Sequence, residues 1–233
     1  MLRKLFLSLL FAAGCFPLSA ARPGFTLWQL PPQGPSQMNS YVIRTDAGRV
    51  AVIDGGTAAD APYLRGFLAA LGNRVEWWFV THPHIDHMGA LTEILRTPGG
   101  IEIGTIYQSP MNDAQLNTDL NRRKLADAYL EALAASGLRV ENLTGREMRL
   151  DGLHLKVLQV NDTTTLVNAY NNASIVLRLW DKRKSLLMLG DTGEESGDRL
   201  LRSVPQEELD CDYIQMAHHG QMGVREEFYR TVR

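Results

Sequence analysis

Residues 81–87 read THPHIDH, and this stretch decides how the rest of the chain is interpreted. It holds three of the six histidines of the protein, together with Asp86. Histidine is the commonest transition-metal ligand and binds metal as the neutral imidazole. Three imidazoles and a carboxylate crowded into a core would otherwise carry costly unpaired polar atoms. A metal ion would satisfy all of them, so the stretch predicts a metalloenzyme.

The elements around this stretch alternate between strands and helices. The first half predicts strands at 25–30, 40–44, 49–53, 75–80 and 103–107, and helices at 58–71, 88–95 and 113–136. The second half predicts strands at 153–160, 175–179, 186–189 and 213–216, and helices at 194–201 and 225–232. This order is typical of mixed sheets covered by helices. Ligands carried at strand ends, as THPHIDH is, fit such an architecture.

Composition and length limit the class of protein. The chain has 233 residues, of which 45% are hydrophobic and 21% charged, which is ordinary for a globular protein with one full-sized core. The formal net charge is −2, so there is no broad electrostatic footprint for nucleic acid.

The first 21 residues have the pattern of a secretory signal peptide. A basic start is followed by an apolar run and by the small residues Ser19, Ala20 and Ala21. We therefore expect residues 1–21 to be a signal and residues 22–233 to form one domain that is exported to the periplasm or secreted. The alternative is a lipid anchor at Cys15, which follows Ala-Ala-Gly. No transmembrane segment is expected once the signal is removed.

A resemblance to a known family rests on four stretches. THPHIDH resembles the HxHxDH signature of the metallo-β-lactamase superfamily. Asp54-Gly55-Gly56, Gly190-Asp191 and His218-His219-Gly220 resemble further motifs of that superfamily, in the same order. The resemblance runs from about residue 40 to residue 220. It implies a four-layer αββα sandwich and a hydrolase that uses two divalent metal ions.

The resemblance also implies roles for individual residues. His82 and His84 would hold the first metal, Asp86 and His87 the second, and Asp191 would bridge the two. His219 would complete the second site, whereas His218 would protonate the leaving group, and the opposite choice between these two histidines stays open. Asp86 would also orient the attacking hydroxide that the metals generate, and Asp54 would orient the metal loop. Zinc is the default metal for such ligands, with manganese or iron as alternatives.

One family ligand has no clear counterpart. Many members carry another histidine between the HxHxDH loop and the late aspartate, and here that interval holds only His154, in a strand of alternating polarity. We interpret His154 as a surface residue, which leaves the first site open for water. Asn171 or Asn172 could face this open site, and the alternative is a capped loop before a strand. The pattern resembles the branch that contains competence-protein hydrolase domains and phosphorylcholine esterases.

The predicted function is therefore hydrolysis of an ester, with a phosphodiester preferred because two cations favour an anionic substrate, either a small molecule or a polymer. One alternative is a lactonase or β-lactamase-type hydrolase of a cyclic ester or amide. A second alternative is an inactive metal-binding envelope protein. The helical pattern is still running at Arg233, which indicates either a fragment without its closing elements or a chain completed by another subunit.

Overall fold

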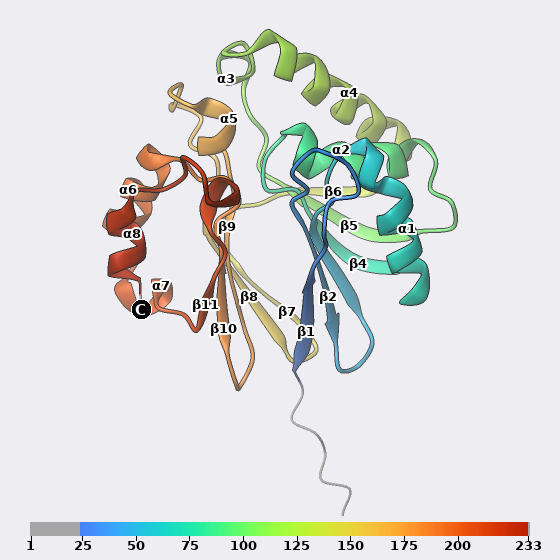
Figure 1. Cartoon of the computed structure of the whole chain (residues 1–233), viewed down its shortest axis with the longest axis horizontal. Helices are drawn as coiled ribbons and strands as arrows, with labels where there is room; N and C mark the ends of the chain where they lie inside the picture. The colour runs from blue at the N-terminus through green and yellow to red at the C-terminus, as the bar shows by residue number, and fades with distance from the viewer. Residues whose placement is uncertain (1–23, 233) are drawn as a thin grey trace, which may run out of the picture.

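The computed structural model describes residues 24–232, and the expected signal peptide, with Cys15, lies outside them. Two β-sheets pack face to face, and helices cover the outer face of each, so the predicted four-layer αββα arrangement is confirmed (Figure 1). Within residues 24–232, no helix is long and apolar enough to cross a membrane.

The first sheet carries the segment that contains THPHIDH. Its strands, in spatial order, are β1 (Phe25–Gln29), β2 (Ser40–Thr45), β3 (Val50–Asp54), β4 (Arg74–Phe79), β5 (Glu102–Gln108) and β6 (Arg139–Asn142). β1 to β3 are antiparallel, whereas β3 to β6 are parallel. The outer face is covered by η1 (Ala58–Asp60), α1 (Ala61–Ala70), α2 (Ile85–Arg96) and α4 (Leu120–Ser136).

The second sheet is mostly antiparallel. Its strands, in spatial order, are β11 (Tyr213–Ile214), β10 (Ser185–Met188), β9 (Val176–Trp180), β8 (Leu153–Gln159) and β7 (Glu147–Leu150). Only β10 and β11 are parallel among these neighbours. The remaining elements are α3 (Asp113–Leu116), α5 (Ala169–Asn172), α6 (Glu194–Ser203), α7 (Gln206–Leu209), η2 (Ala217–Gly220) and α8 (Glu226–Thr231).

Three hydrophobic layers hold the four structural layers together. Alternate side chains of β2 point to opposite faces, so Val42 packs under α1 and α2 whereas Ile43 packs between the two sheets. Leu155 of β8 contributes to the same central layer from the second sheet. Leu187 of β10 faces the other way and packs with Phe228 of α8. Each sheet is therefore buried on both faces near its centre.

The predicted helix over 113–136 is wrong in one respect, because the structure divides it into α3 and α4. The break follows from two successive N-caps. The Asn112 side chain accepts a hydrogen bond from the backbone N–H of Gln115, and the Asp119 Oδ1 accepts from the N–H groups of Asn121 and Arg122. A capped start at Asp119 therefore begins a separate helix, α4. Sequence reasoning also missed β6, β7, α5 and α7, which are all four residues long.

Candidate metal centre

The parallel pairing of β3 and β4 brings the first site residues together. The carboxyl ends of neighbouring parallel strands lie at the same edge, so Asp54, at the end of β3, meets Thr81, just after β4. Asp54 Oδ1 accepts from the Thr81 N–H at 2.8 Å, and Asp54 Oδ2 accepts from the Thr81 hydroxyl at 2.8 Å. Asp54 is fully buried and has a φ of 58°, a strained conformation of the kind found at functional sites.

The histidines of THPHIDH divide between two groups. His82 Nε2 and His84 Nδ1 lie 2.9 Å apart, and His82 Nε2 lies 3.6 Å from Asp191 Oδ2. These three residues form one group whose ligand atoms all lie within 4.8 Å of one another. All three are buried, and they come from a loop of the first sheet and a loop of the second.

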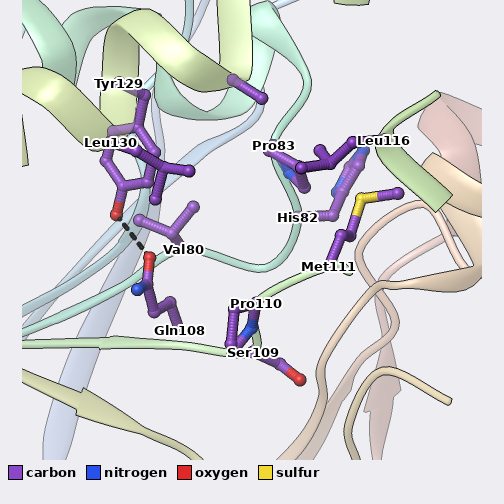
Figure 2. A pocket seen from close by; sticks show the side chains of 11 residues that line it. Val80, His82, Pro83, Gln108, Ser109, Pro110, Met111, Leu116, Tyr129 and Leu130 are labelled. Atoms are coloured by element: carbon purple, nitrogen blue, oxygen red, sulfur yellow. Dashed lines mark hydrogen bonds between the residues drawn. The ribbon is translucent and has the colours of Figure 1, made fainter. Parts of the chain in front are cut away.

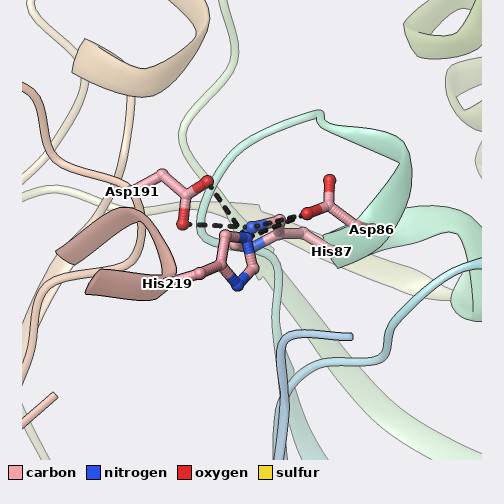
Figure 3. A group of neighbouring side chains, drawn as sticks. All are labelled: Asp86, His87, Asp191 and His219. Carbon is pink, nitrogen blue, oxygen red and sulfur yellow. Dashed lines mark ion pairs between the residues drawn. The ribbon is translucent and has the colours of Figure 1, made fainter. Parts of the chain in front are cut away.

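A second group adjoins the first and shares Asp191. It consists of Asp86, His87, Asp191 and His219 (Figure 3). His87 Nε2 lies 3.2 Å from Asp191 Oδ1 and 3.8 Å from Asp86 Oδ2. His219 Nε2 lies 2.9 Å from Asp86 Oδ2 and 3.6 Å from Asp191 Oδ2. Asp191 therefore has one oxygen near His87 and the other near His82 and His219.

The atoms of the second group fit a metal ion better than they fit one another. His87 Nε2, His219 Nε2 and Asp191 Oδ1 are buried and form no hydrogen bond of acceptable geometry with any part of the chain between residues 24 and 232. They nevertheless lie only 3 to 4 Å from neighbouring ligand atoms, as given above. Buried polar atoms without partners are rare and costly. Lone pairs that converge without bonding to each other are the arrangement that a cation would satisfy, with the imidazole and carboxylate ligands that zinc accepts.

Ser174 and Gln215 fix the position of Asp191. The Ser174 hydroxyl accepts from the Asp191 N–H at 3.0 Å and lies 3.3 Å from His82 Nδ1. The Gln215 Oε1 accepts from the N–H groups of Leu189 and Gly190, at 2.9 and 2.8 Å. Gly190 has a φ of 56°, and a Cβ there would lie 3.1 Å from the Ser174 hydroxyl. The glycine is thus required by both the turn and the close approach.

Sequence reasoning did not identify Thr81, Ser174 or Gln215 as site residues. Thr81 directly precedes His82, and Ser174 lies two residues after Asn172, so their closeness in the sequence to these candidate residues could have pointed to them. Gln215 follows a very short strand, and nothing in its local sequence indicates that its side chain returns to the loop at Gly190.

The two adjacent histidines of η2 are placed differently. His219 belongs to the second group, whereas His218 Nε2 lies 4.0 Å from Asp191 Oδ2 and His218 Nδ1 lies 3.1 Å from the carbonyl oxygen of Met222. Both have positive φ, at 50° and 56°, which turns the two rings in different directions. The His218 side chain is 24% exposed and borders the open side of the site.

The two asparagines also differ. Asn172 uses its side chain within the fold, since its Nδ2 donates to the Val167 carbonyl and to Glu195, and its Oδ1 accepts from the Ser196 N–H. Asn172 therefore agrees with the alternative of a capped loop rather than with a position that faces the open site. Asn171 is 4% exposed, and its Oδ1 has no hydrogen-bond partner within residues 24–232. His154 stacks on Trp180 at 5.3 Å and is not part of either group.

The electrostatic environment favours the ligand forms of several residues. Burial, reinforced by the other histidines of the site, lowers the pKa of His82 well below its usual value. Burial and the charge of Arg122 lower the pKa of His84 to about 4. Burial raises the pKa of Asp86, but its contacts with His219 and His87 outweigh this effect and bring it to about 2. At neutral pH, these imidazoles are neutral and this carboxylate is charged, as metal ligands must be.

His87 behaves differently in the chain without metal. Burial alone would lower its pKa, but the charges of Asp191 and Asp54 raise it well above the usual value. A cation that binds to Nε2 would therefore displace a proton, which couples metal affinity to pH.

Three pockets formed by residues 24–232 border residues of the two groups, and one of them, of about 510 Å³, lies beside His219 against Asn39, Gln215 and Met216. A pocket of about 220 Å³ opens above the metal centre and is bordered by Gln37, Pro83, His84, Ile85, Asp86, Arg122, Leu125, Asp191, His218 and His219. A smaller one of about 40 Å³ lies behind His82 and Pro83, against Met111, Leu116 and Tyr129, and the Tyr129 hydroxyl closes it by donating to Gln108 at 3.1 Å (Figure 2). The pocket of about 220 Å³ has room for part of a substrate, whereas that of about 40 Å³ would hold only a few water molecules.

Comparison with solved structures finds proteins of the same fold at low sequence identity. The metallo-beta-lactamase fold protein YhfI from Bacillus subtilis is 13% identical to this chain. The match covers 75% of this chain and 64% of YhfI, with a TM-score of 0.45. The metallo-beta-lactamase GOB-18 from Elizabethkingia meningoseptica is 14% identical over 83% of this chain and 82% of its own, with a TM-score of 0.48. Zn(2+)-bound PqqB from Methylobacterium extorquens is 14% identical, over 70% and 57%, with a TM-score of 0.44. Similarities of this strength do not identify a substrate.

The chain spans less than two thirds of the length of YhfI and PqqB. No match was found among curated proteins. The family model "Metallo-beta-lactamase superfamily" matches residues 33–134, which include Asp54 and the whole of THPHIDH, whereas Asp191 and His219 lie beyond its end. The two-sheet fold and the shared Asp191 agree with that match. Over residues 33–134, the chain therefore resembles the metallo-beta-lactamase superfamily, a superfamily of metal-dependent hydrolases.

Proposed function

We propose that this protein is a hydrolase with two metal ions that cleaves a phosphodiester. His82, His84 and Asp191 would hold one metal, and Asp86, His87, Asp191 and His219 the other. The observation that carries the proposal is the sharing of Asp191, since its Oδ2 lies 3.6 Å from His82 of the first group, whereas its Oδ1 lies 3.2 Å from His87 of the second. Zinc suits this set of imidazoles and carboxylates. Manganese and iron are the alternatives, and the experiment described below compares all three metals.

The two metals, when bound, would lower the pKa of water and neutralise charge that develops on the substrate. The chain contributes orientation and proton transfer. Asp54 holds His87 in one tautomer, and Ser174 holds the backbone of Asp191. A phosphodiester carries one negative charge, which suits a site designed for two cations better than a neutral amide does.

His218 is the residue that we assign to protonation of the leaving group. It borders the open pocket, and its Nδ1 lies within hydrogen-bond distance of the Met222 carbonyl. A carbonyl only accepts, so Nδ1 must carry its hydrogen, which leaves Nε2 to exchange a proton on the side of Asp191. Histidine is the side chain that most often serves as a general acid in enzymes.

We also propose that the protein is exported to the periplasm or secreted, and that its anionic substrate is either a small molecule or a polymer. These proposals are supported by the pattern of residues 1–21 and by the open pocket above the site.

The deciding experiment measures metal content and hydrolysis of bis(p-nitrophenyl) phosphate together. The protein is loaded in turn with zinc, manganese and iron, and compared with an Asp191→Ala variant and an Asp46→Ala control, whose carboxylate lies outside both groups and accepts from the Gly24 N–H. Two metals per chain and turnover, both lost only in Asp191→Ala, are expected. Two metals without turnover, but with hydrolysis of lactones or β-lactams, would overturn the phosphodiester assignment. Absence of bound metal after loading would overturn the hydrolase proposal itself.

A further inference from the structure

The pocket above the metal centre is bordered by one charged side chain that neither the metal groups nor the proposed proton transfer uses. Arg122, in the first turn of α4, is the only lysine or arginine among the described residues that border this pocket. The other charged groups there are Asp86 and Asp191, both of which belong to the proposed metal ligands. Arg122 is therefore the only permanent positive charge that the chain itself presents to a molecule in the pocket.

The contacts of Arg122 locate its side chain and leave its donors available. Its Nε lies 3.5 Å from Asp119 Oδ2, and its guanidinium carbon lies 5.9 Å from the centre of the Tyr170 ring. Within residues 24–232, no hydrogen bond is formed by its two terminal nitrogens. The side chain is 48% exposed, so those nitrogens can be approached by a ligand without breaking an internal bond.

The surroundings of Arg122 connect it to the metal centre. Tyr170 is 1% exposed, its hydroxyl donates to the Leu116 carbonyl, and its ring stacks on His84 at 5.5 Å with an interplanar angle of 5°. Asp119 is itself fixed as the N-cap of α4. The guanidinium is thus held beside a rigid aromatic ring that packs directly on a proposed metal ligand.

The rim near Arg122 is apolar. Ile85 and Leu125 border the same pocket and are 39% and 40% exposed, which is high for side chains of this size. A ligand with an anionic group for Arg122 and an apolar group for this rim would match both features. Arginine suits such a role because its planar guanidinium can bind phosphate oxygens through two hydrogen bonds.

We propose that Arg122 determines the substrate class of this site, by binding a non-bridging oxygen of a phosphodiester whose apolar ester group contacts Ile85 and Leu125. This inference rests on the proposed function. Arg122 acts in recognition, because nothing in its geometry places it in the transfer of a proton.

The test compares an anionic and a neutral substrate with the same leaving group in the metal-loaded protein. Bis(p-nitrophenyl) phosphate is the anionic diester, and diethyl p-nitrophenyl phosphate is the neutral triester. The variants are Arg122→Gln, Arg122→Lys and the control Lys124→Gln, which removes the same charge two residues further along α4 at a position that does not border the pocket. Metal content and circular dichroism are measured for each.

We expect Arg122→Gln to raise KM for the diester about tenfold or more, the range for loss of a hydrogen bond to a charged group. Arg122→Lys should restore part of the loss, whereas Lys124→Gln should change nothing, and KM for the triester should be the same in all variants. An unchanged KM for the diester in Arg122→Gln, or an equal rise for both substrates, would overturn the inference.

Failure of the proposed function is recognised separately, because the unmodified protein would then hydrolyse neither substrate. The diester remains a ligand in that case, and its binding is measured by calorimetry. Weaker binding to Arg122→Gln than to Lys124→Gln would support the role of Arg122, and equal binding would refute it.

Discussion

Asp54 Oδ2 lies 2.8 Å from His87 Nδ1, and both side chains are fully buried. A carboxylate only accepts hydrogen bonds, so His87 must carry its hydrogen on Nδ1. Its Nε2 is thereby directed toward Asp191 and Asp86. A residue at the end of β3 thus decides which nitrogen of a histidine in α2 faces the metal centre.

This contact predicts the effect of Asp54→Asn. An amide has the same shape but no charge, so it would hold His87 and Thr81 less firmly. Loss of such an orienting carboxylate typically lowers metal affinity about 10- to 100-fold. We expect a loss of this size for one of two metals, measured by titration against a chelator. Unchanged affinity for both metals, with an intact circular dichroism spectrum, would show that Asp54 does not orient the site.

Replacement of each of the two histidines of η2 by alanine should have a different effect. His219→Ala removes a member of the second group, so the metal content should fall from two ions per chain toward one. His218→Ala should keep both metals but reduce kcat by about 10²- to 10⁴-fold, the usual contribution of a general acid. Metal analysis and steady-state kinetics on the same samples measure both effects. The reverse pattern would exchange the two assignments.

Removal of metal should lower thermal stability. A ligand present at a hundredfold excess over its Kd stabilises the folded state by about 2.7 kcal/mol per site. For a domain of this size, each kcal/mol corresponds to about 2–4 °C, so we expect Tm to fall by roughly 5 to 10 °C for each site that a chelator empties, and by roughly 10 to 20 °C when it empties both. Restoring zinc should reverse it, and Asp191→Ala should show almost no response. A response of normal size in that variant would place the metal elsewhere.

Substitution by alanine should change the free energy of unfolding in opposite directions at Gly89 and at Gly66. A Cβ on Gly89, in α2, would lie 2.8 Å from the backbone nitrogen of Ala58, so Gly89→Ala must push α2 away from η1. We expect a loss of about 1–3 kcal/mol in the free energy of unfolding. Gly66, in α1, has nothing within 4 Å of the same position, so Gly66→Ala should stabilise by up to about 1 kcal/mol. Urea unfolding of both variants measures the difference, and equal effects would contradict the packing described here.

A contact between the two sheets should be lost in acid. Asp151, in the turn between β7 and β8, accepts from the Thr45 hydroxyl at 2.7 Å and pairs with Arg49 at 2.9 Å, and these contacts lower its pKa. A lowered folded-state pKa stabilises the protein above the unfolded value of about 3.9, and the contribution disappears as the pH falls below it. Because the pair is partly exposed, we expect Asp151→Asn to cost about 0.5–1 kcal/mol at pH 7.

The same variant provides its own control at low pH. The difference in unfolding free energy between Asp151→Asn and the unmodified protein should shrink toward zero as the pH falls from 5 to 3. A difference that is constant over this range would mean that the charge of Asp151 contributes nothing.

The sequence by itself determined the local parts of this protein. THPHIDH must form a turn between a strand and a helix, because its histidines and aspartate cannot share one face of a regular element. The strands of both sheets were predicted to within about two residues where apolar residues run together, as in β3 and β4. The four-residue elements β6, β7, α5 and α7 were missed, since so few residues carry no periodicity that can be recognised.

Only the tertiary structure decided which atoms meet. His82 and Asp191 are more than a hundred residues apart, and they come within 3.6 Å only because the two sheets pack face to face. Tertiary contacts also engage the side chain of Asn172 within the fold and place Arg122 beside Tyr170. Local sequence fixes which groups a loop carries, because neighbours along the chain set its conformation. Whether these side chains point toward the same metal centre depends on contacts between distant parts of the chain, which local sequence patterns do not contain.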